Sequence, residues 1–234
     1  MSKQSGHLFK PATAVSVPLL SGCAGPLSTL DPAGPSADLV AGLWWIMLTG
    51  AGLITLLVFG LIVLAWRRTG HTVSDEAPQE KVWILGLGIG FTLTVLVALV
   101  GYGLWLGERL LTRDDGTFRV TAHARQWGWE FTQPGPDATP ITTTGVLYVP
   151  AGQPFDIDIT SSDVIHSFWV PRLGGKLDAV PGRINRARLS ADAPGTYEGL
   201  CAEFCGLGHA TMRFNVVVYP AGNFPDLPES EARP

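Results

Sequence analysis

Residues 201–212 read CAEFCGLGHATM, and this segment decides how the C-terminal half of the chain is interpreted. It holds two cysteines, a histidine and a methionine, although the whole chain has only three Cys and three Met. Thiolate, imidazole and thioether groups suit copper or zinc rather than magnesium or calcium. The segment therefore predicts a metal site, and the sequence around it must indicate which metal and which fold.

A disulfide between Cys201 and Cys205 is the simplest alternative, because two nearby thiols often pair in an oxidising compartment. A disulfide gives no reason for His209 four residues later, or for Met212 three residues after that. Structural zinc sites have little use for a thioether, whereas copper accepts His, Cys and a long, weak bond to Met. The set of donors therefore favours copper.

A second histidine must come from elsewhere, because a blue-copper site needs one Cys, two His and usually one Met. His166 in SSDVIHSFWVP is the best candidate, and His123, in a strand-like run, is the competitor. The segment also has one Cys more than a mononuclear site needs. Two copper ions could share both sulfurs and take one His each, which would use every donor.

The region from about residue 115 onward has the pattern of short β-strands. Phe155, Ile157 and Ile159 alternate with polar residues, and the same period of two recurs in MRFNVVVYP near the end. Pro- and Gly-rich stretches such as QPGPD and VPAGQP separate the runs. We therefore predict an all-β sandwich or Greek-key barrel over residues 115–220, followed by a polar tail over 221–234.

Two long apolar runs precede this region. Residues 39–66 and 82–107 contain no Asp, Glu, Lys or Arg, and each exceeds the roughly 20 residues needed to cross a bilayer. Tryptophans fall near the ends of these runs, where an aromatic belt is expected. The mean hydropathy of +0.24 and the charged content of 15% fit the same interpretation. We predict two transmembrane helices over residues 39–107, joined by a short cytoplasmic loop.

The N-terminal residues resemble a bacterial lipoprotein signal peptide, in which a modestly apolar stretch ends in LLSGC. The resemblance implies removal of residues 1–22 and lipidation of Cys23 on the outer face; the alternative is an ordinary surface cysteine. Residues 23–38 would then be a periplasmic segment. Because two spans return the chain to the same side, the β-domain is expected in the periplasm of a multi-pass protein of the bacterial inner membrane.

The pattern around residues 201–212, with DVIHSFWVP upstream, resembles the dinuclear CuA centre in subunit II of haem-copper cytochrome c oxidases. The likeness runs from Cys23 to about Pro220 and includes the two helices, QWGW and KLDAVPGR. It implies a helix hairpin followed by a cupredoxin-like Greek-key sandwich. It also implies the ligands of two copper ions, which are the bridging Cys201 and Cys205, one each of His166 and His209, and, more weakly, Met212 and the backbone carbonyl of Glu203.

The resemblance implies three further roles. Trp127 would be the residue through which electrons from cytochrome c enter, and the side chain of Glu203 would reach a magnesium ion at the border with subunit I. Glu80 would mark a proton-uptake entrance near the inner end of the second helix. Arg125 and Gly128 stand where the family often has His and an aromatic residue, and this departure concerns the docking surface rather than the copper site.

The expected function is therefore that of a subunit which passes electrons from cytochrome c to the haem of subunit I, where O₂ is reduced to water with proton translocation. The partners implied are subunit I, other oxidase subunits, cytochrome c and membrane lipid, with no nucleic acid. A CuA-bearing subunit of a membrane nitric oxide reductase is an alternative, because the partner chain sets the reaction. A membrane-anchored copper carrier is another, and it would need a more open site.

Overall fold

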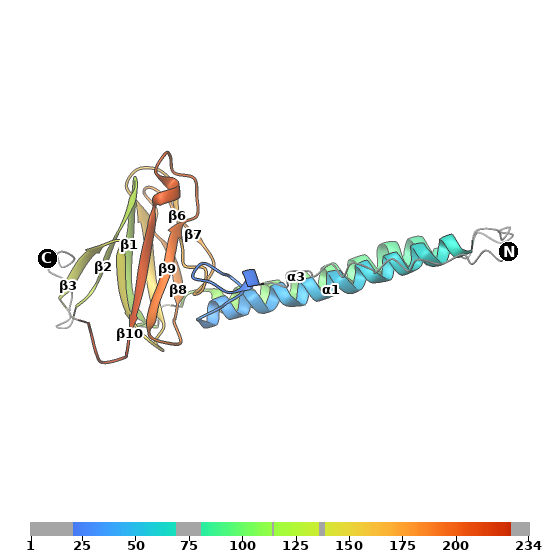
Figure 1. Cartoon of the computed structure of the whole chain (residues 1–234), viewed down its shortest axis with the longest axis horizontal. Coiled ribbons are helices and arrows are strands. Elements are labelled where there is room, and N and C mark those ends of the chain that lie inside the picture. The colour runs from blue at the N-terminus through green and yellow to red at the C-terminus, as the bar shows by residue number, and fades with distance from the viewer. Residues whose placement is uncertain (1–20, 69–80, 114, 136–138, 226–234) are drawn as a thin grey trace, which may run out of the picture.

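The computed structural model describes residues 21–68, 81–113, 115–135 and 139–225. Two helical segments project from one side of a β-sandwich, as Figure 1 shows. Glu80 and most of the expected signal peptide lie outside the described residues, so these predictions have no structural counterpart here. Cys23 ends a short 3-10 helix, Ser21–Cys23, which lies beside the sandwich end of the helices.

Both expected transmembrane helices are present. Helix α1 spans Pro35–Arg67; the second helix begins as a π-helix, Val82–Phe91, and continues as α3, Thr92–Leu110. Within the described residues these two helices are long and apolar enough to cross a membrane, with hydropathies of 2.5 and 2.3. Helix α1 begins earlier than residue 39 because Pro35 suits the first helical turn, where an amide would have no partner.

Within the described residues, ten strands form two five-stranded sheets, with the orders β3-β2-β1-β5-β8 and β4-β10-β9-β6-β7. The β1–β5 and β4–β10 pairs are parallel, and the other pairs are antiparallel. The predicted pair of apolar helices followed by an all-β sandwich is confirmed. The strands are β1 Phe118–Arg125, β2 Gly128–Pro134, β3 Pro140–Thr144, β4 Val146–Pro150, β5 Phe155–Ser161, β6 His166–Trp169, β7 Leu177–Ala179, β8 Asn185–Leu189, β9 Gly195–Cys201 and β10 Arg213–Tyr219.

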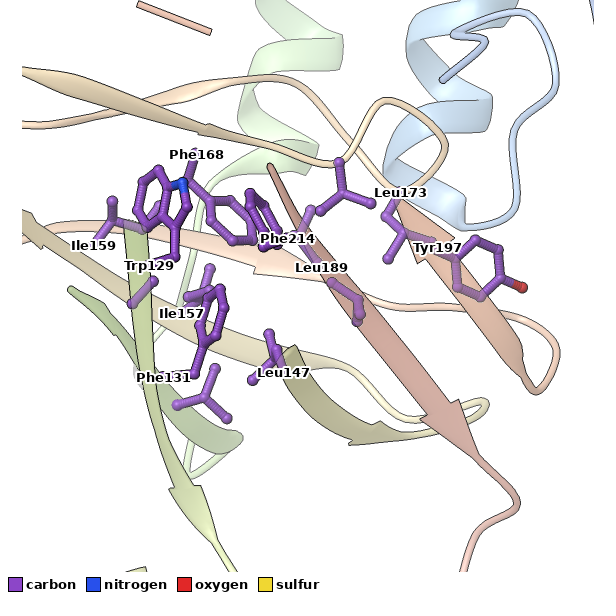
Figure 2. Packing of buried hydrophobic residues seen from close by; sticks show 14 of the residues in the cluster. Trp129, Phe131, Leu147, Ile157, Ile159, Phe168, Leu173, Leu189, Tyr197 and Phe214 are labelled. Atoms are coloured by element: carbon purple, nitrogen blue, oxygen red, sulfur yellow. The ribbon is translucent and has the colours of Figure 1, made fainter. Parts of the chain in front are cut away.

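Aromatic side chains from both sheets fill the core between them (Figure 2). Trp129 and Phe131 of β2 meet Phe168 of β6 and Phe214 of β10, with ring centroids 4.7–6.4 Å apart. Such pairs add to the stabilisation from area burial. The ring of Trp129 also lies 6.3 Å from that of His166, so the core supports the first residue of β6 directly.

The expected alternation is present in β5 and β10. The apolar residues of β5, Phe155, Ile157 and Ile159, are buried, and so is every second residue of β10 from Phe214. One residue on the polar side of β5 departs from the pattern, because Asp156 is only 1% exposed. Its carboxylate is paired with Arg188 of β8, which compensates for the burial of the charge.

Candidate metal centre

The predicted metal ligands come from two places at one end of the sandwich, the start of β6 and the segment from the end of β9 to β10. His166 begins β6 and Cys201 ends β9, and these strands are neighbours in one sheet. The chain then returns through a 3-10 turn, His209–Thr211, to β10. The amide of Cys201 donates to the carbonyl of Met212 at 2.9 Å, which closes the loop between the two strands.

The two cysteine sulfurs lie side by side without a bond. Cys201 Sγ and Cys205 Sγ are 3.8 Å apart, and both cysteines are free. A disulfide would require about 2.05 Å. The structure therefore holds a pair of thiols, and the disulfide alternative does not describe it.

Each thiol faces one imidazole. His166 Nδ1 is 3.8 Å from Cys201 Sγ, and His209 Nδ1 is 3.6 Å from Cys205 Sγ. The ligand atoms of His166, Cys201 and Cys205 all lie within 4.8 Å of one another, and the three residues are buried. Of the two candidate histidines, His166 is thus the one that lies beside the thiols.

Each thiol also faces one weaker donor. The backbone carbonyl oxygen of Glu203 is 3.2 Å from Cys201 Sγ, and Met212 Sδ is 3.7 Å from Cys205 Sγ. The two halves of the site therefore match, since each has a thiol, an imidazole and one weak donor. These are the donor types that copper accepts.

Asp163 orients His166. Its carboxylate lies 2.9 Å from His166 Nε2 and accepts the backbone amides of Gln126 and Val164, each at 2.7 Å. Burial alone would raise the pKa of Asp163, but these hydrogen bonds outweigh it and lower the pKa to about 2. The ionised carboxylate favours a proton on Nε2, which leaves the Nδ1 lone pair facing Cys201.

The thiol of Cys205 holds its proton firmly in the absence of metal. Burial, together with the neighbouring Cys201, raises the pKa of Cys205 to about 11. Because a metal binds the thiolate, binding must release this proton near neutral pH.

Trp127 and Gln126 contact the loop that carries Cys205. The indole N–H of Trp127 and the side-chain amide of Gln126 both donate to the carbonyl of Cys205, at 3.2 and 2.7 Å. A Cβ atom at Gly208 would lie 2.4 Å from the ring of Trp127, so the indole packs directly on the loop backbone. The side of Trp127 away from the loop faces solvent, and the residue is 45% exposed.

Two predicted site residues have other partners. His123 Nδ1 lies 2.9 Å from Thr160 Oγ1, across β1 and β5, and no described contact links it to either thiol. The carboxylate of Glu203 pairs with Lys176 Nζ at 3.2 Å, and Lys176 also contacts Asp178 at 3.3 Å. The side chain of Glu203 is therefore neutralised within the chain itself.

Sequence reasoning missed Asp163, Gln126 and Lys176. Asp163 precedes His166 by three residues in the same loop, which is the signal that could have revealed its role. Gln126 adjoins Trp127, but its contact with Cys205 joins residues 79 positions apart. Only the fold brings that pair together.

Known proteins are similar to the part of the chain that carries this site. Residues 137–219, which include all six donors, match the family model for the periplasmic domain of cytochrome c oxidase subunit II. Over these residues the chain therefore resembles the periplasmic domain of cytochrome c oxidase subunit II. Trp127 and Gln126 precede the matched residues.

One relative is similar over most of this chain. The chain is 32% identical over 214 residues to cytochrome c oxidase subunit 2 of Alkalihalophilus pseudofirmus, an alignment that covers 85% of the chain and 60% of that relative. The chain thus spans about 60% of the length of this relative.

Two solved structures are also similar. One is the periplasmic domain of subunit II of cytochrome oxidase of Bradyrhizobium japonicum, at 27% identity over 48% of this chain and 88% of that one, with a TM-score of 0.42. The other is a haem-copper terminal oxidase dimer, at 24% identity over 57% of this chain and 99% of the matched one, also with a TM-score of 0.42.

Proposed function

We propose that this chain is the electron-transfer subunit of a haem-copper cytochrome c oxidase of a bacterial inner membrane. In this proposal two copper ions occupy the matched halves of the site, and oxygen is reduced to water in subunit I. The match of residues 137–219 to the family model and the two membrane-length helices support this assignment.

One observation carries the proposal, which is the pair of thiols 3.8 Å apart with one imidazole and one weak donor beside each. Cys201 and Cys205 would bridge the metals, and His166 and His209 would bind one each. Met212 and the Glu203 carbonyl would complete the two sets. Bound copper supplies one-electron redox chemistry.

The surroundings of the donors favour electron transfer over substrate binding. Cys201, Cys205, His166 and Met212 are each less than 5% exposed, so no open position faces solvent on that side. The aromatic core beneath β6 and the carboxylate of Asp163 hold the donors in place before and after a change of charge. A closed site also disfavours the copper carrier, because a carrier must release its metal.

Electrons would enter at Trp127, which contacts the Cys205 carbonyl on one side and solvent on the other. Other exposed apolar side chains lie just before β6 and between β9 and β10, in the segments that carry the donors. They are Val164, Ile165, Phe204 and Leu207. An exposed apolar surface of this kind is typical of a protein docking site. Cytochrome c is the proposed donor. A nitric oxide reductase would differ in the partner chain rather than in these residues.

Three further roles remain proposals. Magnesium at the border with subunit I would have to share the Glu203 carboxylate with Lys176, whose pKa is raised by Glu203 and then by Asp178. Glu80 at a proton-uptake entrance rests on its place in the sequence alone. Lipidation of Cys23 would place acyl chains beside the sandwich end of the helices.

The metal content of the purified full chain tests the proposal. Reconstitution with copper followed by removal of unbound metal should leave two copper ions per chain and intense thiolate-to-copper absorption. A single copper ion per chain, with the spectrum of a blue-copper protein, would contradict it. Binding of zinc in preference to copper would contradict it equally.

A further inference from the structure

Two chain segments lie next to the helices, one before α1 and one after α3, and each contacts an arginine of the sandwich. Residues 31–34 lead into α1, and the described part of the second segment, residues 111–113 and 115–117, lies between α3 and β1. Arg172, which follows β6, contacts the first segment, and Arg188 of β8 contacts the second. The proposed electron-transfer function gives neither arginine a role.

Arg172 binds the segment that leads into α1 at both its backbone and its side chain. Arg172 Nε donates to the carbonyl of Asp31 at 2.8 Å, and a terminal nitrogen lies 3.1 Å from the Asp31 carboxylate. Two residues later, Ala33 donates its amide to the carbonyl of Arg172 at 2.7 Å and accepts the amide of Asp192 at 2.9 Å. This segment is therefore hydrogen-bonded to the sandwich on both sides.

The next residue, Gly34, lies in direct backbone contact with the sandwich. A Cβ atom there would lie 2.0 Å from the carbonyl oxygen of Ser190, so no other residue fits without displacement of the backbone. Helix α1 begins at the following residue. The contact thus extends to the first turn of the helix.

Arg188 binds the segment that leaves α3 and the sheet at the same time. Its guanidinium contacts the carboxylate of Asp156 at 2.7 Å, and it donates two hydrogen bonds to the Asp115 carboxylate, at 2.7 and 2.8 Å. A further bond reaches the carbonyl of Arg113 at 2.7 Å. The hydrogen bonds from Arg188 and Thr117 hold the pKa of Asp115 well below its usual range.

The same two strands carry a second pair that serves as a control. Arg186 pairs with Asp158 two residues along the β5–β8 ladder, in the register that pairs Arg188 with Asp156. Among the contacts described, Asp158 meets neither connecting segment. Loss of its charge therefore perturbs the sheet without changing the contacts of Asp115.

We propose that Arg172 and Arg188 are positioning residues, which fix the orientation of the β-sandwich on the membrane-spanning helices. Relative motion is the default for domains joined by short linkers without a large interface. Because Arg172 holds one segment and Arg188 holds the other, rotation of the sandwich relative to the helices would break one of these contacts. This inference rests on the proposed function: the contacts of Arg172 and Arg188 set the distance from the Cys201–Cys205 pair to the redox centre of subunit I.

Hydrogen exchange on the copper-loaded full chain in lipid nanodiscs tests the contact itself. Asp31→Ala and Asp115→Ala should each speed amide exchange in their own segment several-fold, the factor expected for loss of a partly exposed ion pair. The Asp158→Ala control should leave both segments unchanged. Unaltered exchange in the Asp31 and Asp115 variants would overturn the proposal.

Transient kinetics in the assembled oxidase tests the positioning role. The double variant Asp31→Ala/Asp115→Ala should accept electrons from cytochrome c at the wild-type rate and pass them onward several-fold more slowly. Equal onward rates despite faster exchange would overturn the positioning role. Because hydrogen exchange does not depend on redox chemistry, a failure of the proposed function would appear separately, as a missing copper spectrum.

Discussion

At the scale of single residues, the proposed copper site depends on the equivalence of the two thiols. Replacement of either Cys201 or Cys205 by Ser removes one of the two bridges, and a single thiolate cannot hold both metals in the same way. We expect each variant to lose the dinuclear site while the sandwich still folds, because serine is close in size to cysteine. Copper analysis and circular dichroism measure the two effects. Full copper content with normal oxygen uptake would remove the bridging assignment.

Met212 should behave differently from the cysteines. A thioether at long range adds little binding energy but affects the electronic balance of the site, so Met212→Leu should keep most of the copper while its reduction potential shifts. Redox titration followed by absorption measures the shift. An unaltered spectrum and potential would exclude Met212 from the ligands.

Asp163 gives a prediction about pH. Its pKa is lowered from 3.8 to about 2 in the folded chain, so its ionised form stabilises the fold above pH 3.8, and the contribution is lost as the pH falls toward 2. The metal-free wild type should therefore lose more unfolding free energy than Asp163→Asn between pH 4 and 2. Denaturant titrations across this range measure the difference. Parallel pH profiles for the two proteins would contradict the role given to Asp163.

At the scale of elements, the sequence predicted the strands of the sandwich and the two helices, because periodicity reports directly which face of a strand is buried. Asp156 broke the pattern. Its burial depends on Arg188, which lies 32 residues away, and the β5–β8 register that joins them cannot be derived from local sequence. The candidate ligands were similarly easier to predict than the residues that contact the ligand segment. Cys201 and His209 lie in one segment, whereas Gln126 and Lys176 meet that segment only through the fold.

The contact between the β1–β2 turn and the ligand loop can be tested at Gly208. A methyl group there would lie 2.4 Å from the indole of Trp127, so Gly208→Ala should displace the ring and cost about 1–3 kcal/mol of stability. Tryptophan fluorescence and thermal unfolding measure both effects. Gly175→Ala is the matched control, because a Cβ atom there meets nothing within 4 Å. Equal behaviour of the two variants would exclude the packing contact.

At the scale of the whole molecule, charge and Trp127 should act on different steps. From residue 114 onward the chain has 14 Asp and Glu against 9 Lys and Arg, which attracts a basic donor protein. Salt should therefore slow association, because the Debye length falls to about 8 Å near physiological ionic strength. Trp127→Gln should leave this salt dependence unchanged and slow reduction of the site. Stopped-flow reduction at several ionic strengths separates the effects, and equal reduction rates would refute the role of Trp127.

The central claim is that two metals share one electron between matched halves of a single site. Electron paramagnetic resonance of the copper-loaded, partly reduced full chain tests it most directly, because the hyperfine pattern reports how many copper nuclei the unpaired electron contacts. If both thiolates bridge two copper ions, the spectrum should show one electron shared equally by two copper nuclei. This pattern should be lost in both Cys201→Ser and Cys205→Ser. A pattern from a single copper nucleus in the wild-type chain would contradict it.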